Sequence, residues 1–218
     1  MAASVERPQT IQTMIDGVER YNPENAEVLE DYLATQCKNG EYDLMANLAL
    51  LKLYQFNPQL TKKNVIINVL GKALTAIPNP DFNLCMYLLT DHVEDEQVKS
   101  MMQLQQLLEQ SRYVEFWKTF EQHRALVKDI QGFDDAIRAV VAKVVSMSYQ
   151  NISRSVLESY LSLQGEAFQK FCQQHQWQVE QNVVNIPINK DNEAKTVVVR
   201  ENIKFEQLTK IIGFSNEM

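Results

Sequence analysis

Histidine and acidic side chains are the residues of this chain whose types could support catalysis or metal binding. The three histidines, His92, His123 and His175, fall in three different predicted helices, so their spacing indicates no shared site. Residues 91–96 (DHVEDE) form the one cluster of metal-ligand types, and a solvated acidic turn explains it better because nearby oxygen donors do not by themselves complete a coordination shell. The sequence has no GxSxG, HExxH, P-loop or GxGxxG motif, and no catalytic, metal-binding or cofactor-binding residue is predicted.

Two further patterns have both a functional and a structural interpretation. The cysteines Cys37, Cys85 and Cys172 are widely separated and show no CxxC spacing, so buried core thiols are favoured over a disulfide framework or a zinc site. Residues 104–108 (LQQLL) match the LxxLL form of some partner-binding helices. Their leucines also lie at i, i+3 and i+4, which is the spacing of a helix face packed in a core.

Composition and charge narrow the class of protein. The 218 residues are 45% apolar and 22% charged, which is enough for one large domain or two small ones. The longest apolar runs are a few residues, so we expect a soluble intracellular protein with no membrane contact. The net charge of −7 is uneven, at −6 for residues 1–132 and −1 for residues 133–218. Such an acidic chain is not typical of proteins that wrap nucleic acid.

The elements that would position any functional surface begin with residues 41–58 (EYDLMANLALLKLYQFNP). Their apolar positions run nearly all the way round a helical period, so this helix must be buried on more than one side. Residues 1–8 carry no periodic pattern and are expected to fray. Neighbouring helices are predicted from Thr10 to Val18, Pro23 to Cys37, Leu60 to Ile77, Asp81 to Leu89, Val98 to Leu108 and Arg112 to Ile130. Short Pro- or Gly-marked connections between them favour stacked helical hairpins of a HEAT-like solenoid.

The pattern changes after Gly132. A helix is predicted from Asp134 to Met147, followed by a short strand at Tyr149 to Ile152 and helices that start at Ser153 and Glu166. Two strands, Trp177 to Ile188 and Thr196 to Arg200, are predicted around a polar turn at residues 189–192. This order is that of a winged helix. The predicted fold is therefore mainly α, with a HEAT-like domain at 1–132 and a winged-helix domain with a C-terminal helix at 133–218.

A winged helix often reads DNA, but its recognition helix is then rich in basic residues. Here the segment Glu166 to His175 offers Lys170 as its only fixed positive charge, opposed by Glu166. The predicted wing carries two lysines and two acidic residues between positions 190 and 195. DNA binding is therefore disfavoured, because it draws heavily on basic contacts to phosphates.

Apolar residues left without a place in the predicted core indicate protein contacts instead. The strand alternation directs Val184, Ile186 and Ile188 inward and leaves Val183 and Val198 on the other face, where a sheet edge can extend into a partner's sheet. The last amphipathic segment places Phe205, Leu208, Ile211 and Ile212 on one side. From the pattern alone, this segment packs either internally or on a partner.

Several long segments closely resemble a known family. They are RYNPEN (20–25), YDLMANLALLKLYQFNP (42–58), KALTAIPNPDFNLC (72–85), GFDDAIR (132–138) and SYQNI (148–152), with FW at 116–117. Their order and spacing are similar to those of the k subunits of the eukaryotic translation initiation factor three complex. These are PCI-type scaffold subunits, whose architecture of helical hairpins followed by a winged helix also occurs in the proteasome lid and the COP9 signalosome.

The resemblance implies a non-catalytic scaffold subunit in the PCI and MPN core of the initiation factor. Its implied partners are other subunits of that complex, chiefly subunit l, and the small ribosomal subunit through the complex. By analogy with PCI subunits, Val183 and Val198 would face a partner sheet, and Phe205, Leu208, Ile211 and Ile212 would enter a helical bundle. A cytoplasmic location is implied, with a nuclear pool and direct RNA contact left open. The alternatives are a subunit of the proteasome lid or the signalosome, or a free winged-helix nucleic-acid binder.

Overall fold

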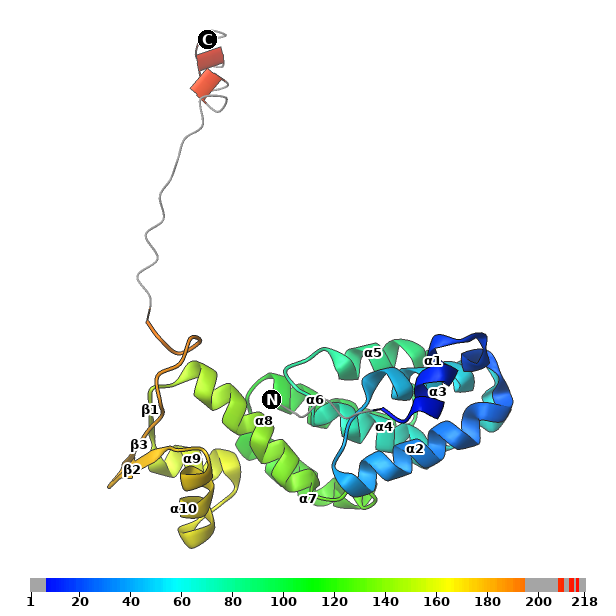
Figure 1. Ribbon diagram of the computed structural model, residues 1–218. Helices are drawn as coiled ribbons and strands as arrows, with labels where there is room; N and C mark the ends of the chain where they lie inside the picture. The colour runs from blue at the N-terminus through cyan, green and yellow to red at the C-terminus, as the bar shows by residue number, and fades with distance from the viewer. Residues whose placement is uncertain (1–6, 195–207, 210–211, 214, 216–218) are drawn as a thin grey trace.

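The computed structural model describes residues 7–194, 208–209, 212–213 and 215, and in these the chain is mainly helical with one small sheet (Figure 1). None of the helices within this described part combines the length and apolarity needed to span a membrane. In chain order the helices and strands are α1 (Gln9–Asp16), α2 (Ala26–Asn39), α3 (Leu44–Phe56), α4 (Lys63–Leu74), α5 (Asp81–Leu88), α6 (Glu96–Glu109), α7 (Tyr113–His123), α8 (Phe133–Ser148), β1 (Asn151–Ser153), α9 (Arg154–Leu161), α10 (Gly165–Gln174), β2 (Gln178–Glu180) and β3 (Val183–Asn185).

The apolar helix predicted near residue 50 is α3. The carboxylate of Asp43 caps it by accepting a hydrogen bond from the backbone N–H of Ala46 at 3.2 Å. The helix contacts α1, α2, α4 and α5, and Leu50, Leu51 and Leu53 are fully buried. Its predicted burial on more than one side is confirmed.

Local signals placed several helix boundaries correctly. The side chain of Asn22 accepts the backbone N–H of Glu24 at 3.1 Å, and Pro23 opens a single 3₁₀ turn before α2 begins. Gly40 ends α2 in the left-handed conformation, with φ 72°. The helix predicted from Thr10 to Val18 is shorter in the structure, because α1 ends at Asp16, and Val18 is 85% exposed.

The predicted helix from Arg112 to Ile130 is shorter in the structure. Helix α7 ends at His123 and is followed by a 3₁₀ turn, Arg124–Val127. Arg124 pairs with Glu121 at 2.7 Å and with Asp134 at 3.1 Å, which joins the end of α7 to the start of α8. Two ion pairs to different helices therefore anchor the chain where the α-helix stops.

Helix α7 also links the N-terminal helices to the last part of the chain. The indole N–H of Trp117 donates to the backbone oxygen of Tyr160 at 2.8 Å, and the guanidinium of Arg138 on α8 donates to the oxygen of Leu161 at 3.0 Å. Buried apolar side chains from Ile11 to Ile186 form one continuous cluster. The division at Gly132, the HEAT-like stacking and the winged-helix assignment stay predictions.

The sheet is antiparallel, with strand order β1-β3-β2. Val184 of β3 lies opposite Ile152 of β1 and Val179 of β2. The single strand predicted from Trp177 to Ile188 is wrong, because the chain turns at residues 181–182 and folds back as a hairpin. Gln181 takes a positive φ of 39°, a conformation that the residue type does not signal. The second predicted strand, Thr196 to Arg200, lies outside the described residues.

Candidate protein-interaction surface

Three of the six predicted interface residues lie in the described part of the chain. Val183 on β3 is 41% exposed, and its strand is hydrogen-bonded on both sides, so a partner could reach its side chain but not its backbone. Leu208 and Ile212 are helical and are 40% and 56% exposed. Val198, Phe205 and Ile211 lie outside the described residues.

Three exposed apolar residues that the sequence did not indicate gather where α8 passes into β1. Met147 is 41% exposed, Tyr149 39% and Ile188 69%. The chain at Ile188 returns to the end of α8, because the side-chain amide of the next residue, Asn189, donates to the oxygen of Ser146 at 2.8 Å. We call Met147, Tyr149 and Ile188 the exit patch. Its exposure makes it a candidate protein contact.

The prediction that Ile188 points inward is wrong. Strand β3 ends at Asn185, so the two-residue alternation holds for Val184 and Ile186 and then stops. Pro187 has no backbone N–H and cannot continue a central strand. This proline was the signal in the sequence that could have located the end of the strand.

The predicted polar turn at residues 189–192 is confirmed, and it docks on the end of α8. The backbone N–H of Asn192 donates to the side-chain oxygen of Asn189 at 3.1 Å. The side-chain amides of Asn189 and Asn192 donate to the oxygen of Ser146, at 2.8 and 3.1 Å, and Asn192 also reaches the oxygen of Tyr149 at 3.1 Å. Carbonyls at the C-terminus of a helix lack intrahelical donors, and the side chains of this turn supply them.

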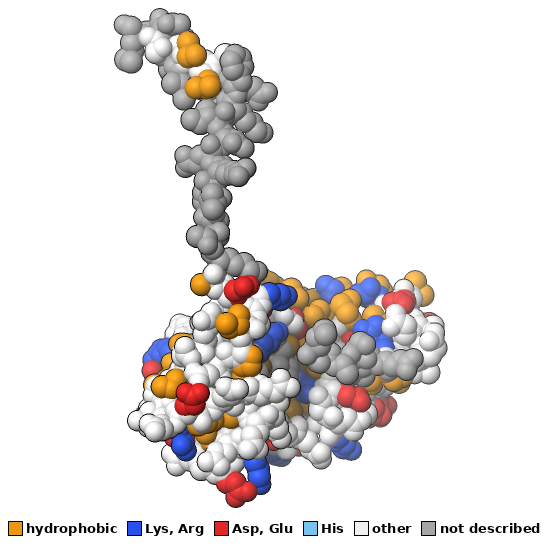
Figure 2. All heavy atoms as spheres, turned by 60° about the vertical axis from the view of Figure 1, so that its left-hand side comes forward, with side chains coloured by type: hydrophobic (Ala, Val, Ile, Leu, Met, Phe, Trp, Pro, Cys, Tyr) orange, Lys and Arg blue, Asp and Glu red, His pale blue; other side chains and the backbone are white. Residues whose placement is uncertain are grey.

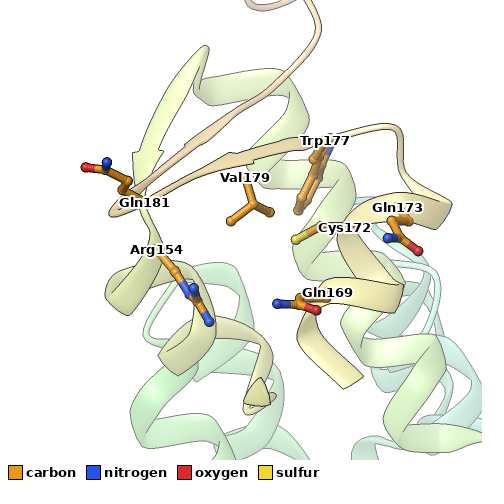
Figure 3. Close-up of a pocket in the computed structure, with 7 residues that line it drawn as sticks. All are labelled: Arg154, Gln169, Cys172, Gln173, Trp177, Val179 and Gln181. Carbon is orange, nitrogen blue, oxygen red and sulfur yellow. The ribbon is translucent and has the colours of Figure 1, made fainter. Parts of the chain in front are cut away.

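A pocket of about 340 Å³ lies between α10 and the β2–β3 hairpin (Figure 3). Trp177, Val179 and Cys172 point toward its centre, whereas Gln173 and Gln181 turn away. Arg154 also lines it, and its guanidinium is held by Glu158 at 2.9 Å and lies 5.7 Å from the centre of the Phe168 ring. The pocket thus has an apolar floor and one neutralised cation, an arrangement suited to packing.

The thiol in this pocket is not poised for nucleophilic chemistry. Burial raises the pKa of Cys172 to about 11, and burial likewise raises the pKa of Cys37 to about 11 and of Cys85 to about 12. All three cysteines are free and buried, as predicted. At pH 8 a thiol of pKa 11 is about one part in a thousand thiolate, and the thiolate is the nucleophile.

We expect all three cysteines to resist a thiol-specific reagent in the native protein. At about pH 8 the folded chain should release almost no thionitrobenzoate from Ellman's reagent, because the thiols are both protonated and shielded. The same chain in concentrated guanidinium chloride serves as the control and should report three thiols. Rapid reaction of one native cysteine would show that its pocket opens.

The face formed by the sheet, α9 and α10 lacks the clustering of positive charge that nucleic acid requires. Figure 2 turns this side toward the viewer and shows basic side chains scattered among uncharged polar ones. Lys170, the one lysine of the segment tested as a recognition helix, pairs with Glu166 at 2.8 Å. Phosphate contacts need free, clustered cations, so the described surface supports protein contact over duplex binding.

The remaining motifs have structural roles. Leu104, Leu107 and Leu108 are buried, so the LxxLL pattern belongs to the core. In the acidic turn Asp95 pairs with Lys63 at 2.6 Å and Glu94 with Lys99 at 2.9 Å. Across the described residues, no group of three or more His, Cys, Asp or Glu side chains could hold a metal ion.

Comparison with known proteins decides the family. The model of the CSN8/PSMD8/EIF3K family matches residues 60–198, more than half of the chain. The chain belongs to this family. Within the CSN8/PSMD8/EIF3K family it is similar to fungal proteins named eukaryotic translation initiation factor 3 subunit K. The identity is 40% to that of Botryotinia fuckeliana (95% of this chain, 93% of the relative), 41% to that of Neurospora crassa (97% and 96%) and 36% to that of Aspergillus terreus (94% and 93%).

These matches confirm the resemblance predicted from segments such as residues 42–58. Alignment over 94–97% of the chain also extends the similarity beyond residues 20–152, where the quoted segments lie. The similarity to the subunit K members of the CSN8/PSMD8/EIF3K family therefore also includes the C-terminal part of the chain.

Proposed function

We propose that this chain is a non-catalytic scaffold subunit of eukaryotic translation initiation factor 3. The observation that carries the proposal is identity of about 40%, along nearly the whole chain, to proteins named as subunit K of that factor. In this role the chain contributes protein contacts in the PCI and MPN core while initiation complexes assemble on the small ribosomal subunit. Its work is then done in the cytoplasm, and a nuclear pool is compatible with it.

The proposed contacts lie at the C-terminal end of the chain. There we assign a winged helix whose sheet side, with Val183 and Val198, faces a partner subunit, chiefly subunit l. The segment from Phe205 to Ile212 would join a helical bundle with other subunits. The exposure of Val183, Leu208 and Ile212 supports this assignment, since large apolar side chains gain about 1.5–3 kcal/mol each when they are removed from water.

Purification from native extract tests the proposed function. The full chain, tagged at its N-terminus and expressed at natural level, should recover the initiation factor subunits, with subunit l in stoichiometric amount. Recovery of proteasome lid or signalosome subunits instead would overturn the assignment. Recovery of nucleic acid without these proteins would favour the free winged-helix alternative.

The tail contact is tested by replacing Leu208 and Ile212 together with aspartate. Both side chains are exposed, so the isolated chain should keep its helical signal and its melting temperature. Buried charges oppose association, and recovery of the partner should fall at least tenfold, which equals about 1.4 kcal/mol. Val18→Asp, at an exposed site near α1, is the matched control and should leave recovery unchanged. Loss of the fold in the double variant would show instead that the tail packs internally.

A further inference from the structure

A second pocket, of about 370 Å³, lies on the N-terminal helices, apart from the surface described above. It opens where the end of α2, the last turn of α4 and the start of α8 meet. The backbone N–H of Gln131 donates to the oxygen of Cys37 at 2.9 Å and holds two of its walls together. Its lining residues include Lys38, Gly40, Lys72, Thr75, Gly132 and Ala136.

Lys72 is the unusual member of this lining, because its side chain is charged and only 3% exposed. Within the described part of the chain its ammonium group makes no hydrogen bond or ion pair. Burial lowers the pKa of Lys72, while the neighbouring Cys37 and Glu41 oppose that shift without reaching a hydrogen-bonded contact. The side chain is buried as a whole, but its ammonium group keeps contact with solvent and lines the pocket, so an anion in the pocket could reach it.

The N-terminus of α8, which carries partial positive charge, borders the same pocket through Gly132 and Ala136. Gly132, in the left-handed conformation with φ 67°, precedes the helix and supplies no side-chain cap. The first backbone bond runs from Ala136 N–H to the Gly132 oxygen at 2.9 Å, so the N–H groups before Ala136 have no acceptor within the helix. These N–H groups and the helix dipole favour an anion at this end.

The acidic groups around the pocket do not neutralise it fully. Asp134 and Asp135, in the first turn of α8, are engaged by Arg124 at 3.1 Å and Arg138 at 2.7 Å. Asp129 is close enough to raise the pKa of Cys37, although burial is the larger cause of that shift. Lys38 provides a further cation at the rim.

We propose that this pocket binds a small oxyanion group between the Lys72 ammonium and the first turn of α8. The same chemistry is offered by the carboxylate of an acidic side chain on another protein and by free phosphate. One buried lysine with one helix terminus suits a single anionic head group. A nucleic-acid backbone would need an array of cations.

Nuclear magnetic resonance titration of the full chain tests the proposal. Inorganic phosphate and N-acetylglutamate amide are added separately at constant ionic strength, and the amide signals of residues 132–135 and Gly40 are followed. We expect saturable shifts with at least one anion, and the anion that saturates at the lower concentration identifies the source. Lys72→Met should weaken binding at least tenfold, whereas Lys143→Met, an exposed site later in α8, should not change it.

Two outcomes would overturn the proposal. One is a shift that grows linearly without saturating for both anions in the unmodified chain. The other is equal saturation in the Lys72→Met chain. Lys72→Gln keeps a polar end without the charge, so it replaces the methionine variant if that one fails to fold and should show the same loss. Because these measurements use the isolated chain, their failure is independent of whether the chain joins the initiation factor.

Discussion

Replacing Phe120 with alanine is expected to lower the free energy of unfolding by about 3–5 kcal/mol, the range for removing a buried aromatic ring. Phe120 is fully buried on α7, and its ring centre lies 5.7 Å from that of Phe116, 6.1 Å from Trp117 and 5.2 Å from Phe133. The guanidinium of Arg124 lies 4.8 Å from the centre of the same ring. The substitution therefore leaves a cavity at the point where α7 meets α8.

Urea unfolding followed by circular dichroism measures this effect. Tyr87→Ala is the matched control, because it removes an aromatic ring that is 74% exposed, and it should change stability by less than about 0.5 kcal/mol. Phe120→Leu keeps most of the apolar volume, so its loss of stability should lie between those of Phe120→Ala and Tyr87→Ala. Equal stability of the Phe120→Ala and Tyr87→Ala chains would contradict the central role given to this ring cluster.

Replacing Asp43 with alanine is expected to lower the free energy of unfolding by about 2–4 kcal/mol, because α3 loses its cap and Arg7 loses its partner. The carboxylate accepts Arg7 at 2.5 and 2.8 Å and the Ala46 N–H at 3.2 Å, and it is 8% exposed. Asp43→Asn is the matched variant, because asparagine retains the capping oxygen and removes only the charge. The asparagine variant should lower the free energy of unfolding by about 1–2 kcal/mol, the scale of a charge-assisted hydrogen bond.

The contribution of the Asp43 charge to the free energy of unfolding should depend on pH. Burial alone would raise the pKa of Asp43, but the hydrogen bonds from Arg7 and the Ala46 amide outweigh it, so the pKa lies below its ordinary value. A carboxyl whose pKa is lower in the folded state stabilises the fold above the unfolded pKa of about 3.9, and this stability is lost as pH falls through the folded pKa.

The test is the difference in unfolding free energy between the native chain and Asp43→Asn, measured from pH 7 down to pH 3. We expect a constant difference above about pH 5 that shrinks below about pH 4. The two chains share every other carboxyl group, so the difference isolates Asp43. A difference that stays constant to the lowest pH would contradict the Arg7 pairing.

Local sequence signals predicted the helical elements well because they act over a few residues. Asn22 and Pro23 start the second helical segment, and Gly40 ends it, through chemistry contained within a single turn. The i, i+3, i+4 spacing correctly placed Leu104 and Leu108 in the core. Where an element ended early, as β3 does at Asn185, the extrapolated period put Ile188 on the wrong side.

Local sequence patterns could not predict contacts between distant segments. Arg7 was assigned to a fraying end at residues 1–8, yet it pairs with Asp43, 36 positions away. The sequence could equally not indicate the exit patch, because its members become neighbours only when β3 pairs with β1. Which exposed residues form the candidate surface therefore depended on strand pairing.

The sequence by itself determined the helical class, the main core positions and the resemblance to the family, because periodicity, turn chemistry and long matching segments are properties of the chain alone. The tertiary structure decided what surrounds each charged or apolar side chain. Lys72 reads as an ordinary helix lysine in the sequence and becomes a buried cation in a pocket only because α2, α4 and the start of α8 meet around it. Lys72 is buried only because these helices pack together, and no local sequence pattern indicates that packing.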